Sequence, residues 1–154
     1  MSETTTIRLP PKLRARLKVI AKETDRSVHS IIVEAVEKHA AYEEQMRKLV
    51  KEALTADEEM DRTGEVYRAE DVHAWAERLA EGGDAAKASA SAIRSAVENL
   101  ATHPLVGRRV EGDLRELVIS YGATGYIALY RFIVQRDEVR VLALRHQREI
   151  GYLP

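Results

Sequence analysis

The sequence predicts an α+β protein with a helical N-terminal part and a β-rich C-terminal part. Residues 11–102 carry apolar side chains mostly at helical spacing, whereas residues 114–144 contain three runs rich in β-branched and aromatic residues. A short alternation of polar and apolar residues precedes the first helical pattern, at residues 4–10. We therefore expect one strand, then several helices, then an antiparallel three-stranded sheet.

The first predicted strand covers residues 4–10. Its alternation places Thr5, Ile7 and Leu9 on one face, and Thr4, Thr6 and Arg8 on the other. A single strand leaves its backbone edge unpaired, so we expect it to pair with the same strand of a second chain. A two-stranded ribbon of this kind fits the major groove of DNA.

Two short helices are predicted next. Pro11 suits the first turn of a helix that runs to Glu23, and Ser27 suits the N-cap of a second helix that begins at Val28. The strand and the two helices together, residues 4–40, hold too little apolar surface for an independent monomer. Dimerisation through these residues is therefore predicted as part of the fold.

The helical pattern continues over residues 42–62, and further helices are predicted over residues 69–80 and 84–103. The break at Gly82-Gly83 is the main predicted boundary within this helical part. We expect residues 66–67 to form a short extended link ahead of the middle helix.

Three β-rich runs follow a linker at residues 107–113. They are Leu114–Tyr121, Tyr126–Val134 and Glu138–Leu144, and the connections between them have hairpin length. The prediction is an antiparallel three-stranded meander packed on a helix or a helical hairpin.

Composition and charge restrict the class of protein. The chain has 154 residues, no cysteine and no apolar run long enough to cross a bilayer, so we expect a cytoplasmic protein with no membrane partner. Residues 51–83 carry ten acidic and four basic side chains, whereas six basic residues and one acidic residue occur in residues 1–22. The basic N-terminus suits a surface that meets phosphates, and the acidic middle suits a basic partner.

Residues 4–40 resemble the ribbon-helix-helix proteins, the CopG/ParD-like DNA-binding fold of antitoxins. The matching strings are TTTIRLPPKLRARL, the turn TDRS, and SVHSIIVEAVEKHA. The resemblance implies a homodimer that binds operator DNA, with Thr4, Thr6 and Arg8 facing the bases. The start of the second helix, at Ser27 and Val28, can offer backbone amides to a phosphate.

The rest of the chain resembles a neutralising arm followed by a ParE/RelE-superfamily toxin. The arm resemblance rests on GEVYRAEDVHAWAERLAEG, and the toxin resemblance on AIRSAVENLATHP, LVGRR, DLRELVISYGATGYIALYRF and VLALRHQREIGY. The toxin part lacks the first strand usual for that superfamily. The implied domains are 1–45 for DNA binding, 46–83 for the toxin-neutralising arm and 84–154 for the toxin. The expected arm contacts are Val66, Tyr67, Val72, Trp75 and Leu79.

The function predicted from these resemblances is an antitoxin fused to a toxin that it neutralises, within one chain or by exchange between two chains. The alternative is an active toxin, either an inhibitor of DNA gyrase or a ribosome-dependent mRNA endonuclease. No catalytic residue is assigned; Glu111, Arg131 and His146 are weak candidates for ribonuclease chemistry. No spacing typical of a metal site or cofactor loop occurs, so no metal or cofactor is expected.

Overall fold

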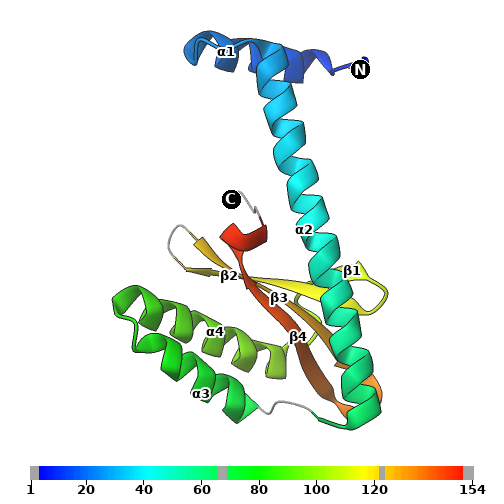
Figure 1. The fold of residues 1–154 in the computed structure, drawn as a ribbon, viewed down its shortest axis with the longest axis vertical. Coiled ribbons are helices and arrows are strands. Elements are labelled where there is room, and N and C mark those ends of the chain that lie inside the picture. The colour runs from blue at the N-terminus through cyan, green and yellow to red at the C-terminus, as the bar shows by residue number, and fades with distance from the viewer. Residues whose placement is uncertain (1–3, 66–68, 122–123, 151–154) are drawn as a thin grey trace. The chain divides into compact units, whose positions relative to one another are not determined.

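The computed structural model describes residues 4–65, 69–121 and 124–150. In these residues the chain forms four helices and one four-stranded antiparallel sheet, with two short 3-10 turns (Figure 1). The helices are α1 (Pro11–Glu23), α2 (Val28–Thr63), α3 (Ala69–Ala80) and α4 (Asp84–Thr102). The strands are β1 (Arg108–Glu111), β2 (Leu114–Tyr121), β3 (Thr124–Ile133) and β4 (Glu138–His146). The 3-10 turns are η1 (Val134–Arg136) and η2 (Gln147–Ile150).

The chain divides into two compact units, residues 1–41 and 42–154. Helix α2 belongs to both units, because it runs without a break from Val28 to Thr63. Its start confirms the predicted cap: the Oγ of Ser27 accepts a hydrogen bond from the backbone N–H of Ser30 at 3.0 Å. Helix α1 has the bounds that the sequence predicts, with proline at its first turn.

The first unit contains no strand within its described residues. Residues 4–10 are not part of any sheet, so the predicted strand, and with it the ribbon, is not confirmed. The physical reason is that an extended segment needs a partner backbone, and a single chain supplies none here. Among residues 4–41 only Ala21 is buried, whereas Ile7, Val19 and Val36 are more than half exposed.

The sheet has four strands in the order β1-β2-β3-β4, so the prediction of three strands was wrong. The extra strand is β1, which was predicted as part of the linker 107–113. It has one apolar side chain, Val110, between charged residues, and so it lacks the alternation that predicts a strand. The strand forms through backbone pairing with β2 across the turn at Gly112, whose φ is +54°, although its side-chain pattern does not predict a strand.

The strands predicted from the three β-rich runs are confirmed, with small shifts of their ends. β2 has the predicted bounds, β3 begins at Thr124, and β4 extends to His146. Between β3 and β4 the chain turns at Asp137, which has a left-handed φ of +49°. Aspartate tolerates this conformation better than most residues do.

Helices cover both faces of the sheet in the second unit. The C-terminal half of α2 packs against one face, and α3 and α4 form a helical hairpin on the other side (Figure 1). The hairpin face includes Tyr130, which is completely buried, and its hydroxyl oxygen accepts a hydrogen bond from the backbone N–H of Gly107 at 2.9 Å. A Cβ at Gly107 would lie 2.7 Å from that hydroxyl, so glycine is required there.

Candidate functional site

The contact between α2 and the sheet has an apolar centre. Met46, Leu49, Val50 and Ala53 follow the spacing of one helical face, and all four are buried. They form a single cluster with sheet residues of three strands, which are Leu114, Ile127, Leu129 and Leu142. The C-terminal half of α2 is therefore part of the hydrophobic core of the second unit.

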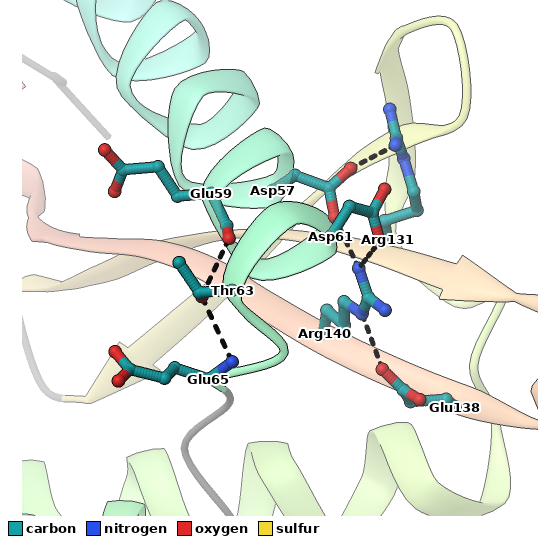
Figure 2. Close-up of polar contacts among 8 residues, drawn as sticks. All are labelled: Asp57, Glu59, Asp61, Thr63, Glu65, Arg131, Glu138 and Arg140. Carbon is teal, nitrogen blue, oxygen red and sulfur yellow. Dashed lines mark hydrogen bonds and ion pairs between the residues drawn. The ribbon is translucent and has the colours of Figure 1, made fainter.

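A set of ion pairs around the buried Asp57 and Arg140 continues this contact toward the end of α2. The carboxylate of Asp57 is 3% exposed and pairs with Arg131 of β3 and Arg140 of β4. Its Oδ1 accepts a hydrogen bond from Nη1 of Arg140 at 3.3 Å, and its Oδ2 accepts one from Nη1 of Arg131 (Figure 2). One acidic side chain of the helix thus joins two neighbouring strands.

Arg140 is the centre of these pairs. Its side chain is 5% exposed, and besides Asp57 it donates to Asp61 at 2.7 Å and to Glu138 at 2.5 Å (Figure 2). The hydrogen bond to Asp61 is the largest cause of a raised pKa at Arg140. The same bond lowers the pKa of Asp61 from its ordinary value of 3.8. Both shifts favour the charged forms that hold α2 on the sheet.

Two of the other ion pairs in this unit involve α2 or the sheet face that it covers. Arg145 of β4 pairs with Glu52 of α2 at 2.9 Å, with both side chains substantially exposed. Glu116 of β2 is 5% exposed at its side chain and pairs with Arg108 of β1 at 2.9 Å. This bond is also the largest cause of the raised pKa of Arg108. Register places Glu116 opposite Leu129, which is on the face that α2 covers.

The three weak catalytic candidates do not come together. Arg131 is paired with Asp57, whereas His146 lies at the other end of the sheet with its ring edge-on to Tyr126, at 5.1 Å between centroids. Since Tyr126 and Arg131 are five residues apart in β3, these two sites are separated by roughly 16 Å. Glu111 is exposed in β1, two strands away from Arg131.

The residues predicted for a neutralising arm lie in or before α3. Val66 and Tyr67 are outside the described residues, as is the side chain of Leu79. Val72 is half-buried and Trp75 is 37% exposed. Helix α3 is paired with α4, to which it is joined by an ion pair between Glu77 and Arg94 at 2.9 Å.

The residues predicted for DNA contact lie in the first unit. Thr4, Thr6 and Arg8 are exposed. Ser27 uses its hydroxyl as the helix cap, and Val28 is half-buried. All five are at or near the surface of the described chain, as a binding role requires.

The residues of α2 that pair with the sheet were not singled out in the sequence. Glu52, Asp57 and Asp61 stand within an acidic stretch in which only Asp57 is buried. The usable signal was the position of Asp57 four residues after Ala53 on the apolar stripe, which places a carboxylate on the buried face.

A family model described as the ParE toxin of the type II toxin-antitoxin system, parDE, matches residues 68–151, which is more than half of the chain. The chain belongs to the ParE toxin family. The match begins ahead of α3, so both helices of the hairpin and all four strands lie within the ParE family region. Residues 42–63 of α2, which cover its sheet, lie outside that region.

The chain is also similar to a curated toxin. Toxin RelE3 of Caulobacter vibrioides is 44% identical over 57 residues, which are 37% of this chain. The matched segment spans 60% of the length of that relative. No solved structure matches the chain.

The described residues hold no group of three or more His, Cys, Asp or Glu side chains placed to bind a metal ion. Within the same part of the chain, no helix is both long and apolar enough to cross a membrane.

Proposed function

We propose that this chain is a ParE-like toxin fused to its own antitoxin, with residues 42–63 of α2 acting as a cover that keeps the toxin inactive. The observation that carries the proposal is the burial of Asp57 between Arg131 and Arg140. The cover comes from outside the family region and lies against the sheet inside it. In this proposal the neutralising role belongs to α2, and α3 is part of the toxin.

The charges under the cover support a surface that is exposed in another state. A permanent core is usually apolar, because a buried ion pair adds little net stability over well-packed apolar residues. Here the side chains of Arg140 on β4 and Glu116 on β2 are almost fully buried. Both residues lie on the sheet face that α2 covers. Charged residues of this kind suit a sheet face that is exposed to water when the helix is displaced.

Growth of bacterial cells that express the full chain tests the cover. The wild-type chain should permit growth, whereas the double variant Asp57→Arg/Asp61→Arg should arrest it, because two new cations face Arg131 and Arg140. The matched control is Glu58→Arg/Glu59→Arg, which makes the same charge change on exposed positions of the same helix. Arrest by the wild type, or growth with a soluble, folded Asp57→Arg/Asp61→Arg protein, would contradict the proposal.

The first unit supplies the second half of the proposal, a dimeric DNA-binding module that represses its own promoter. Its support is the exposure of apolar residues that a small domain normally buries, including Ile7, Val19 and Val36. A second copy of residues 4–40 would cover them and pair with the extended segment. Thr4, Thr6 and Arg8 would then face operator DNA, with Ser27 and Val28 near a phosphate.

Solution mass and a mobility-shift assay with the upstream DNA test this module. A dimer that shifts the DNA is expected, and Arg8→Ala should weaken binding by about 1–3 kcal/mol if Arg8 reads a base. The control is Arg109→Ala, which removes an exposed cation that pairs with Asp113 in the second unit. A protein that stays monomeric at high concentration and leaves the DNA unshifted would exclude the module.

An active toxin remains the second candidate, supported by membership of the ParE family and by the similarity to a protein named as a toxin. Its target would be DNA gyrase or, alternatively, ribosome-bound mRNA. An active toxin would arrest growth as the wild-type chain, and in the ribonuclease version His146→Ala would abolish that arrest. In the gyrase version the arrest would persist, because binding alone is sufficient.

A further inference from the structure

A cavity of about 330 Å³ lies between the helical hairpin and the sheet, and it reaches Arg140, the residue that pairs with Asp57. Its wall is mainly apolar and includes Val97 and Leu100 of α4, Phe132 of β3, and Val139 and Val141 of β4. The volume is within the range of about 300–1,000 Å³ that is typical of small-molecule sites. The apolar wall is partly open to solvent, so a small apolar molecule that covered it would remove apolar surface from water.

Among the charged groups in the cavity wall, those that remain available to a ligand are acidic. Asp137, Glu138 and Arg140 line the cavity. The guanidinium of Arg140 already pairs with Glu138, Asp57 and Asp61, so it has little capacity left for an anion. No ion pair or hydrogen bond to the carboxylate of Asp137 occurs among the described residues, and that side chain is exposed at the turn before β4.

We propose that this cavity binds a compact apolar molecule that carries one amine. The apolar body lies between α4 and the sheet, against Leu100 and Phe132, and the ammonium group lies beside Asp137. Met60, near the end of α2, also lines the cavity, so an occupant also supports the end of that helix. This inference does not depend on the proposed toxin or antitoxin roles.

Three probes with one naphthalene body test the proposal on the full-length protein. They are 1-naphthylmethylamine, 1-methylnaphthalene and 1-naphthoate, which carry a positive, a neutral and a negative substituent. Titration followed by naphthalene fluorescence should give the tightest binding for the amine, about fivefold tighter than for the neutral probe, as an exposed charge pair allows. Naphthoate should bind most weakly. Absence of binding by all three probes, or a preference for naphthoate, overturns the proposal.

Two variants locate the binding. Val97→Phe fills the cavity from α4 and should abolish binding of every probe. Asp137→Asn keeps a residue that tolerates the left-handed turn and should remove only the preference for the amine. Asp113→Asn, which changes an exposed carboxylate outside this cavity, is the control.

Methyl NMR spectra of the wild-type protein give an independent readout in case Val97→Phe does not fold. The amine probe should shift the methyl signals of Leu100, Val139 and Val141 and leave those of Val106, which is exposed outside the cavity, unchanged. Unshifted cavity methyl signals at saturating probe, or unchanged affinity in a folded Val97→Phe protein, place the probe elsewhere and overturn the proposal.

Discussion

The carboxylate of Asp57 and the guanidinium of Arg140 form an almost fully buried ion pair although they are 83 positions apart in the sequence. The pair joins the end of α2 to β4, and Arg131 of β3 shares the same carboxylate. Removal of one member of such a pair is costly, because the remaining charge stays buried without its partner.

Asp57→Ala should therefore lower the free energy of unfolding by about 3 kcal/mol. Arg140 would keep Asp61 and Glu138, which limits the loss. Urea unfolding followed by circular dichroism measures the change. Glu58→Ala, at an exposed position of the same helix, should change the free energy by less than about 0.5 kcal/mol. Equal effects of the two substitutions would mean that the buried pair does not hold α2 on the sheet.

Asp61→Asn should change how stability depends on acid. The pKa of Asp61 is lowered from 3.8 because its carboxylate accepts a hydrogen bond from Arg140, so folding favours the charged form. The stability from this group is fully present above pH 3.8 and is lost as the pH falls through the lowered value in the folded protein. The wild-type protein should exceed Asp61→Asn in stability at neutral pH, and the two should converge in strong acid. A difference in stability between the two proteins that grows as the pH falls would contradict the predicted direction of the pH dependence.

Tyr130→Phe should lower the free energy of unfolding by about 1–3 kcal/mol. The substitution keeps the ring in its buried site but leaves the backbone N–H of Gly107 without its acceptor. Amide hydrogen exchange at Gly107 should also become faster. Unchanged exchange together with unchanged stability would mean that another group satisfies this N–H.

Ser27→Ala should destabilise the start of α2 by about 1 kcal/mol, because the N–H of Ser30 loses its capping oxygen. The measurement is amide exchange at Ser30, which should become faster. Ser27→Asp retains a capping oxygen and is the matched control. Equal exchange in the alanine and aspartate variants would exclude a capping role.

Local signals account for the elements that the sequence predicts well. Pro11 marks the start of α1, Pro104 follows the end of α4, and the alternation in Leu114–Tyr121 defines β2. These features depend on residues close together in the chain, so composition and spacing are sufficient. The sequence does not predict β1, because Arg108 and Arg109 break the alternation of polar and apolar residues. This strand is defined by its pairing with β2.

The candidate site was much harder to predict. The sequence offers Arg131 as a weak catalytic candidate, but its partner Asp57 is 74 positions earlier and stands among several acidic residues that are exposed. The apolar stripe places Asp57 on the buried face of the helix, but which basic side chains meet it depends on how the helix packs on the sheet, and a single sequence does not contain that distance information. The same limit applies to Glu116, whose burial follows from the strand register.

The order of α2 and the sheet along the chain has a consequence for synthesis. Residues 42–63 precede every strand, so the ribosome releases this helix before Arg108–His146 are complete. Because chains are made from the N-terminus at about 5–20 residues per second, the helix is available several seconds before the last strand emerges. In the proposed fusion, the covering helix is therefore present when the toxin sheet folds, and no toxin with an uncovered sheet need accumulate during translation.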